Sequence, residues 1–255
     1  MITIGIDIGS ITAKGVVFSD GKILATQVIF TGYSVDSAGK RILEEVLEIA
    51  GIDRGNVDKI VSTGYGRKSV LFADKVITEI TCHGAGAYFM NPEIRTVIDI
   101  GGQDSKAISI DQDGRVRDFA MNDKCAAGTG RFLEVMARAL EADLDKFGKM
   151  SLLAKTPSKI SSLCTVFAES EVISLISKGE TRENIMAGIH ESVAARVAAL
   201  ANRVGINEPV MMTGGVAKNI GLVKALESKL KVPIIVTDSA QENGAIGAAV
   251  LAAKL

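Results

Sequence analysis

The stretch Gly5-Ile6-Asp7-Ile8-Gly9 recurs as Val97-Ile98-Asp99-Ile100-Gly101, and this repeat decides the fold. In both copies a glycine follows the aspartate by two positions, a lysine follows it by seven, and an Asp-Gly hairpin signal comes next. Hairpins can recur by chance, but here aspartate, glycine and lysine all match in register. Each copy therefore predicts a three-strand meander, and the duplication predicts two like halves with a cleft between them.

The pattern predicts an α/β protein of two pseudo-symmetric halves. Strands are expected within residues 2–30, 57–62, 97–120, 210–213 and 232–237, and helices at 35–50, 78–90, 131–141, 166–177, 182–204, 217–230 and 241–254. We place the first half at residues 1–94 and the second at 95–240. The last helix, in 241–255, is expected to pack back on the first half.

Composition excludes several classes of protein. The chain has 255 residues, 47% of them hydrophobic, with a net charge of -1 and no basic block, so neither nucleic acid nor a membrane is an expected partner. No apolar run reaches spanning length, and the N-terminus does not resemble a signal peptide. Three cysteines make no disulfide scaffold, which favours a reducing cytoplasm.

The first copy offers a phosphate cradle at its glycine turn. Backbone N–H groups of such a turn, with the hydroxyls of a serine and a threonine, can bind phosphate. The predicted nucleotide-binding residues are Gly9, Ser10, Ile11, Thr12 and Lys14. Asp7, at the strand end, is a predicted catalytic residue that would hold Mg²⁺ through water.

The second copy offers a matching turn. Gly101 and Gly102 are its predicted nucleotide-binding residues, and Asp99, Gln103 and Asp104 are predicted catalytic residues. Gln103 or Asp104 could orient an attacking water. Either turn alone is also consistent with a plain hairpin.

A third glycine turn, at Thr213-Gly214-Gly215, lies between a predicted strand and a predicted helix. Its small residues let the backbone approach a flat ligand, which suits an adenosine. Gly214, Gly215 and Asn219 are assigned to that ligand. None of these turns has Walker A spacing or the dinucleotide-binding glycine fingerprint.

Together these stretches resemble the superfamily of actin, sugar kinases and heat-shock chaperone ATPases. The resemblance covers essentially the whole chain and implies ATP and ADP bound between two domains whose hinge closure is coupled to hydrolysis. Gly128-Thr129-Gly130 and Glu242-Asn243-Gly244-Ala245, which follows Gln241, fall where that superfamily has its two inter-domain connections. Gly128, Thr129, Gly130 and Gln241 therefore complete the predicted nucleotide site.

Two cysteine segments resemble a narrower family. Asn122–Phe132, around Cys125, and Cys164–Ser174 look like the activator component of 2-hydroxyacyl-CoA dehydratases. That family also includes ATPase subunits of benzoyl-CoA-type reductases and reductases of double-cubane cluster proteins. The resemblance implies a homodimer with one [4Fe–4S] cluster at its interface, ligated by Cys125 and Cys164 of both chains.

The cysteine count agrees with that implication. A [4Fe–4S] cluster takes four thiolates, and two from each of two chains make four on a two-fold axis. Helix N-termini after both cysteines would favour thiolates. Two small buried residues, or a zinc site shared by two chains, would also fit the count. Cys82 is interpreted as a packed core thiol, and His83 and His190 as polar structural residues.

The sequence thus predicts an ATP-dependent one-electron reductase. Ferredoxin or flavodoxin would supply the electron, and an iron–sulfur dehydratase or reductase would receive it. A small-molecule kinase of the same fold, with Asp99 or Asp104 as base, is the alternative enzyme. A nucleotide-dependent scaffold that forms filaments is the non-enzymatic alternative.

Overall fold

The computed structural model describes residues 1–161 and 164–255. Its first repeat contains the strands and helices β1 (Ile2–Ile8), β2 (Thr12–Ser19), β3 (Lys22–Phe30), α1 (Val35–Ala50), β4 (Lys59–Thr63), β5 (Lys75–Val76) and α2 (Glu79–Met90), with short 3-10 turns at Arg54–Asn56 and Arg67–Ser69. The second repeat contains β6 (Thr96–Ile100), β7 (Ser105–Ile110), β8 (Val116–Asn122), α3 (Gly130–Ala139), α4 (Leu144–Ser151), α5 (Thr165–Ser177), α6 (Arg182–Val204), β9 (Val210–Thr213), a 3-10 turn at Gly215–Lys218, α7 (Ile220–Leu230), β10 (Ile234–Ile235) and α8 (Asn243–Ala252).

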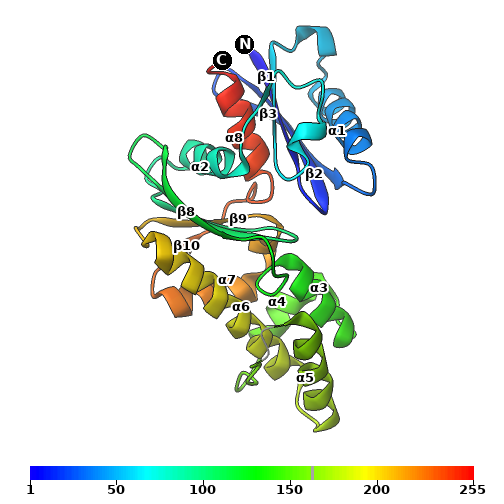
Figure 1. The fold of residues 1–255 in the computed structure, drawn as a ribbon, viewed down its shortest axis with the longest axis vertical. Helices are drawn as coiled ribbons and strands as arrows, with labels where there is room; N and C mark the ends of the chain where they lie inside the picture. Colours follow the sequence, from blue (N-terminus) through cyan, green and yellow to red (C-terminus); the bar gives the residue numbers. More distant parts are fainter. Residues whose placement is uncertain (162–163) are drawn as a thin grey trace. The chain divides into compact units, whose positions relative to one another are not determined.

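The two sheets have the same strand order. One runs β3-β2-β1-β4-β5, and the other, read from the matching edge, runs β8-β7-β6-β9-β10 (Figure 1). In the first sheet β1 pairs antiparallel with β2 and parallel with β4. Each strand of the first repeat therefore has a counterpart in the second, which confirms the duplication predicted from the aspartate, glycine and lysine pattern.

The chain divides into two compact units. Unit 1 comprises residues 1–97, 108–118 and 237–255, and unit 2 comprises 98–107 and 119–236. Helix α8 packs on β1, β4 and α2, so the last helix lies on the first half as predicted. The domain boundaries placed after residues 94 and 240 stay a prediction. No helix among the described residues has the length and apolar character needed to cross a lipid bilayer.

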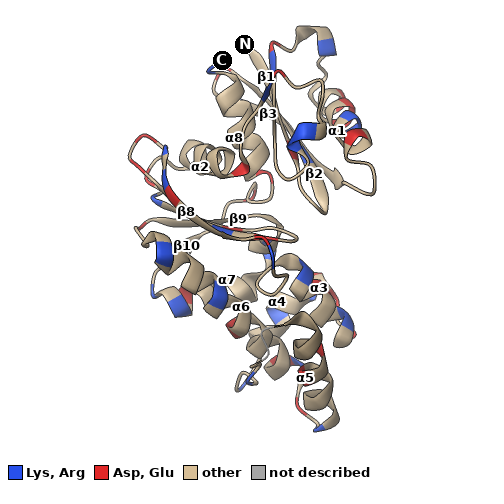
Figure 2. Ribbon diagram, viewed as in Figure 1, with Lys and Arg blue, Asp and Glu red and all other residues tan. Residues whose placement is uncertain are grey.

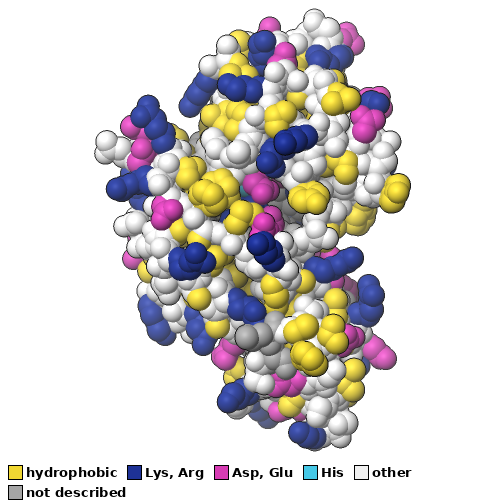
Figure 3. All heavy atoms as spheres, viewed as in Figure 1, with side chains coloured by type: hydrophobic (Ala, Val, Ile, Leu, Met, Phe, Trp, Pro, Cys, Tyr) yellow, Lys and Arg dark blue, Asp and Glu magenta, His cyan; other side chains and the backbone are white. Residues whose placement is uncertain are grey.

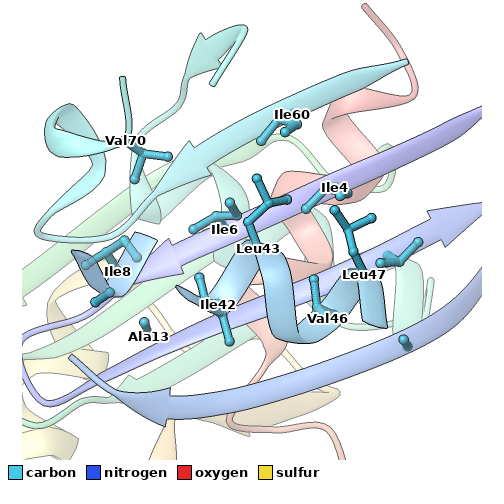
Figure 4. Packing of buried hydrophobic residues seen from close by; sticks show 13 residues of the cluster. Ile4, Ile6, Ile8, Ala13, Ile42, Leu43, Val46, Leu47, Ile60 and Val70 are labelled. Carbon is cyan, nitrogen blue, oxygen red and sulfur yellow. The ribbon is translucent and has the colours of Figure 1, made fainter. Parts of the chain in front are cut away.

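The core of unit 1 is built from strand β1, whose side chains point alternately to the two faces of the sheet, and from the apolar stripe of helix α1. Strand β1 is buried on both faces, since α1 covers one and α8 packs against the other. Helix α1 contributes the apolar stripe that its spacing predicts, and Figure 4 shows this stripe meeting the isoleucines of β1. Ser34 caps its start by accepting a hydrogen bond from the Ser37 N–H, and Gly51 ends it in the left-handed conformation.

Several elements differ from the sequence prediction: strand β5 was not predicted, the last strand β10 is shorter than the expected 232–237, and two helices differ as well. Helix α7 begins at Ile220 rather than near 217, because the Asn219 side chain accepts a hydrogen bond from the Leu222 N–H and so caps it there. A short helix, α4, was not predicted. It is amphipathic and begins after Asp143, whose carboxylate accepts a hydrogen bond from the Asp145 N–H.

His190 in α6 gives unit 2 an expected sensitivity to acid. Ser151 donates to the Gly148 carbonyl, so its oxygen accepts from His190 Nδ1 at 2.9 Å. His190 Nε2 is then unprotonated, and it has no hydrogen-bond partner among the described residues. Burial lowers the pKa of His190 from 6.5 to about 4.

Acidification from pH 7.5 to 5 is therefore expected to destabilise the protein. Between pH 6.5 and about 4 the unfolded chain gains a proton on this histidine that the folded chain cannot accept. The loss amounts to about 2 kcal/mol at pH 5 and to about 3 kcal/mol when complete below pH 4. Urea unfolding at both pH values should show it, and His190→Gln should show a smaller pH dependence. An identical pH dependence in both proteins would contradict this account.

Candidate functional site

The first turn, Gly9–Thr12, closes the β1–β2 hairpin. Asp7 and Lys14 face each other in the strand register, and the Lys14 Nζ lies 3.1 Å from the Asp7 Oδ2. The Gly9 N–H donates to the Thr12 carbonyl at 3.0 Å. The aspartate and the lysine that follows it by seven positions thus form an ion pair across the hairpin, directly behind the turn.

Two glycines pack closely against the Asp7 carboxylate. A Cβ on Gly64, whose φ is +85°, would lie 2.2 Å from the Asp7 Oδ1. A Cβ on Gly244, in the first turn of α8, would lie 3.1 Å from the Asp7 Oδ2. A side chain at Gly64 would clash with the carboxylate, and one at Gly244 would crowd it. Asp7 is a nearly buried carboxylate at a strand end, and its oxygens are of the kind that a hydrated Mg²⁺ takes.

The second turn, Gly101–Asp104, repeats this geometry with an added carboxylate. The Gly101 N–H donates to the Asp104 carbonyl at 3.0 Å, as in the first turn. The Lys106 Nζ lies 3.1 Å from the Asp99 Oδ2 and 2.8 Å from the Asp104 Oδ2. The lysine side chain is 2% exposed, so this is a buried cluster of one positive and two negative groups.

The third glycine turn lies against the second repeat's first strand. The Thr213 Oγ1 donates to the Asp99 Oδ1 at 3.0 Å. Gly214 has a φ of +87°, and a Cβ there would lie 2.3 Å from the Ile100 carbonyl oxygen. The predicted adenosine residues Gly214 and Gly215 thus adjoin Asp99, whereas the Asn219 side chain is engaged in capping α7. Gln241 lies in the segment between β10 and α8.

Asn122, the last residue of β8, holds the segment that contains Cys125. We call residues Asp123–Thr129 the cysteine loop. The Asn122 Nδ2 donates to the Cys125 carbonyl at 2.8 Å and to the Ala127 carbonyl at 3.4 Å. The Asn122 Oδ1 accepts from the Cys125 N–H at 3.3 Å. The thiol of Cys125 is exposed on a backbone that is fixed from both sides.

Helix α3, which directly follows the cysteine loop, is joined to the second turn. The N–H groups of Gly130 and Arg131, the first residues of α3, donate to the carbonyls of Gly101 and Gly102, both at 2.9 Å. Thr129 Oγ1 donates to the Ala126 carbonyl within the loop. These donors of α3 are engaged by the turn, and Cys125 lies before the helix N-cap rather than at it. These contacts therefore do not support the prediction that the N-terminus of α3 favours a thiolate at Cys125.

Cys164 does occupy a helix start. It is the N-cap residue of α5, with extended backbone angles and an exposed thiol. Glu171 on α5 accepts hydrogen bonds from the backbone N–H and the hydroxyl of Ser161, at 3.0 and 2.9 Å. Ser162 and Leu163, which belong to the quoted cysteine motif, lie outside the described residues. Helices α3 and α5 pack together, so the structure brings the two cysteine segments to neighbouring elements.

The remaining cysteine is of another kind. Cys82 is buried between α2 and α8, and burial raises the pKa of its thiol to about 12. This confirms that it is a packed core thiol. Among the described residues no group of three or more His, Cys, Asp or Glu side chains could hold a metal ion. Two exposed thiols in one chain fit half of a four-thiolate site, since four such ligands need a second chain.

The structure brings together more residues than the sequence analysis assigned. Asn122, Gly64 and Gly244 hold or surround predicted site residues without having been assigned to the site. Gly64 lies in the glycine-rich stretch 63–67, a signal that could have found it. Asn122 opens the quoted motif Asn122–Phe132, but the motif does not reveal that its side chain holds the Cys125 backbone. The nucleotide-binding and catalytic assignments of both turns stay predictions.

Residues 4–252 match the BadF/BadG/BcrA/BcrD ATPase family. An activator of lactoyl-CoA dehydratase from Anaerotignum propionicum is 51% identical over 253 residues, covering 99% of this chain and 97% of that protein. The crystal structure of (R)-2-hydroxyglutaryl-CoA dehydratase component A from Acidaminococcus fermentans has a TM-score of 0.96 at 49% identity, covering 100% of this chain and 98% of that one. The activator of 2-hydroxyisocaproyl-CoA dehydratase from Clostridium difficile, with bound ADPNP, has a TM-score of 0.93 at 48% identity, covering 99% and 94%. These structures confirm the predicted two-domain α/β fold.

Proposed function

Because the chain belongs to the BadF/BadG/BcrA/BcrD ATPase family, we propose that it is an ATP-hydrolysing one-electron reductase. It would take an electron from ferredoxin or flavodoxin and deliver it to an iron–sulfur partner enzyme such as a 2-hydroxyacyl-CoA dehydratase. Relatives with half of their residues identical act as activators of such dehydratases. The proposed compartment is the cytoplasm, where thiol ligands stay reduced.

One observation carries the proposal: helix α3, which directly follows the cysteine loop, is hydrogen-bonded to the second turn. The Gly130 and Arg131 N–H groups hold the carbonyls of Gly101 and Gly102, and Asn122 holds Cys125 from the other side. A displacement of the second turn on ATP binding or hydrolysis is therefore passed to the backbone of Cys125. No such path is needed in a kinase or in a scaffold.

Cys125 and Cys164 of two chains would hold one [4Fe–4S] cluster. When bound, this cluster supplies the capacity to accept and release one electron. An exposed cluster of this type in a low-potential protein is oxygen-labile, so anaerobic handling is required. The chain's own part is to present two thiolates per subunit, one from the cysteine loop before α3 and one from the N-cap of α5, and these two helices pack together.

Helix α5 supports the proposed homodimer. Only Ala168 and Val172 of this helix are buried, whereas Val166 and Phe167, next to Cys164, are 65% and 67% exposed. Its other exposed apolar residues are Ile173 and Ile176. Figure 3 shows hydrophobic side chains gathered over the part of the molecule where α5 lies, and Figure 2 shows no basic residue along the helix. An apolar surface around a half-site fits a second copy that brings the other half.

The two turns would bind the nucleotide. In this proposal the first turn and Lys14 hold phosphate, Asp7 holds Mg²⁺ through water, and Gly214 and Gly215 adjoin the adenosine. Gln103 or Asp104 of the second turn would orient the attacking water. The buried pairs Asp7–Lys14 and Asp99–Lys106 support these roles, because they fix both carboxylates before any ligand arrives.

Asp7→Asn and Asp99→Asn are each expected to lower ATP hydrolysis on the order of a hundredfold, because a charged group that positions metal or water is lost. ATPase rates under anaerobic conditions measure this. Asp20→Asn and Asp113→Asn are the matched controls, since these aspartates lie in the Asp-Gly turns between β2 and β3 and between β7 and β8, the next turns of the same two meanders. Equal rates in all four variants would overturn the nucleotide assignment.

An iron count tests the other half of the proposal. Protein purified without oxygen should be a dimer with four irons per two chains and an EPR signal after reduction. A monomer without iron, or a colourless dimer with zinc, would overturn the reductase proposal.

A further inference from the structure

His83 lies beside the Asp7 carboxylate but was assigned only a structural role from sequence. It is buried on α2, in the part of unit 1 where α2 and α8 touch backbone to backbone. A Cβ on Gly247 would lie 1.8 Å from the Cys82 carbonyl oxygen, and one on Gly86 would lie 2.2 Å from the Asn243 carbonyl oxygen. Contacts this close fix the register of the two helices, so they also fix where the imidazole points.

Asn243 on α8 sets the tautomer of His83. The Asn243 Nδ2 donates to the His83 backbone carbonyl at 3.0 Å, a contact that only the amide nitrogen can make. The same Nδ2 lies 3.3 Å from the His83 Nδ1. Because the amide nitrogen has only protons to offer, Nδ1 accepts with its lone pair. A neutral His83 then carries its proton on Nε2.

This Nε2–H faces the same small space as the Asp7 carboxylate. A Cβ on Gly244 would lie 3.0 Å from the His83 Nε2 and 3.1 Å from the Asp7 Oδ2. The two atoms are thus separated by at most the sum of these distances, about the span of one bridging water. The Lys14 Nζ reaches the same Oδ2 at 3.1 Å from the opposite strand.

We propose that His83 is a positioning residue for Asp7, whose Nε2–H, oriented by Asn243, fixes the carboxylate and its bound water for Mg²⁺. The role rests on the proposed function, because it takes Asp7 as the residue that holds hydrated Mg²⁺. Lys14 supplies charge to Oδ2, and His83 supplies a donor of fixed direction without adding charge. A neutral donor suits this place, since a second cation beside Lys14 would oppose the approach of Mg²⁺.

Two substitutions separate this role from a packing role. His83→Gln keeps an amide N–H near the position of Nε2, whereas His83→Asn keeps a polar group only near the position of Nδ1. Both remove the ring. We expect His83→Asn to raise the Mg²⁺ concentration for half-maximal ATP hydrolysis about tenfold, the effect of one hydrogen bond to a charged group. His83→Gln should restore most of that loss, with kcat changed less than the Mg²⁺ dependence in both.

A second readout does not depend on turnover. Nitrogen-15 NMR of histidine-labelled protein should show Nε2 protonated and Nδ1 unprotonated in His83, assigned by its loss in His83→Gln. Titration of Mg²⁺ into the ADP-bound protein should show the same order of affinity, with wild type strongest and His83→Asn weakest. Iron content should be equal in all three proteins.

The outcomes are distinguishable. An Nδ1-protonated ring, or equal Mg²⁺ dependence in His83→Asn and His83→Gln, would overturn the positioning role while leaving the proposed function intact. A wild-type protein that hydrolyses no ATP at any Mg²⁺ concentration would instead overturn the proposed function.

Discussion

Cys125→Ser is expected to yield protein with almost no iron after anaerobic purification. In the proposed dimer Cys125→Ser removes two of the four thiolates, one from each chain. A neutral serine hydroxyl does not replace a thiolate on iron. Asn122 should still hold the loop backbone, because its partners are the main-chain groups of Cys125 and Ala127. The fold should therefore survive while the cluster is lost. Iron analysis, visible absorption and EPR of the reduced protein measure the effect.

Cys82→Ala is the matched control for this experiment. It removes the third cysteine of the chain, but from a buried position in the contact of α2 with α8 rather than from an exposed loop. It should retain full iron with a modest loss of stability. Full iron in Cys125→Ser, or loss of iron in Cys82→Ala, would mean that the cluster ligands have been assigned to the wrong cysteines.

Gly247→Ala is expected to cost about 4 kcal/mol of folding free energy, above the usual range for an overpacked site. The added Cβ would lie 1.8 Å from the Cys82 carbonyl oxygen and 2.8 Å from the Gly86 N. Both atoms belong to the backbone of α2, which cannot rotate away as a side chain can. The small gain in helix propensity from alanine does not offset this. Urea unfolding followed by circular dichroism measures the loss.

Gly55→Ala provides the comparison. Nothing lies within 4 Å of a Cβ at Gly55, and no unusual φ is required there, so the change should stay within about 0.5 kcal/mol. If both glycine variants unfolded at the same urea concentration as wild type, the close approach of α2 and α8 would be wrong. Because α8 packs on β1, its displacement should also expose the Asp7 region to solvent.

The sequence analysis predicted the fold well where local patterns repeat. The register of aspartate, glycine and lysine was enough to place both hairpins, because side chains alternate along strands and turn residues punctuate them. The start of α7 was placed too early, since the capping residue Asn219 follows a 3-10 turn that has no period of its own. Short α4 was missed because its pattern spans barely two turns.

The sequence marks the residues proposed to act in the site, but it does not mark the residues that hold them in position. Asp7, Asp99 and the exposed cysteines are marked by motif and spacing. Asn122 and His83 act through hydrogen bonds to backbone or to residues far along the chain, such as Asn243. Such contacts are set by how elements pack, so they leave no periodic signal in the sequence.

The two turns differ in formal charge, and this difference has a chemical consequence. Asp104 occupies the place that Thr12 has in the first turn, so Lys106 meets two carboxylates where Lys14 meets one. The first group is neutral overall, and the second is negative by one unit. An anionic triphosphate is therefore repelled less by the first hairpin than by the second. In the proposed function this suits the first turn to hold phosphate and the second to orient water, so one exchange of a hydroxyl for a carboxylate would divide these roles between the two copies.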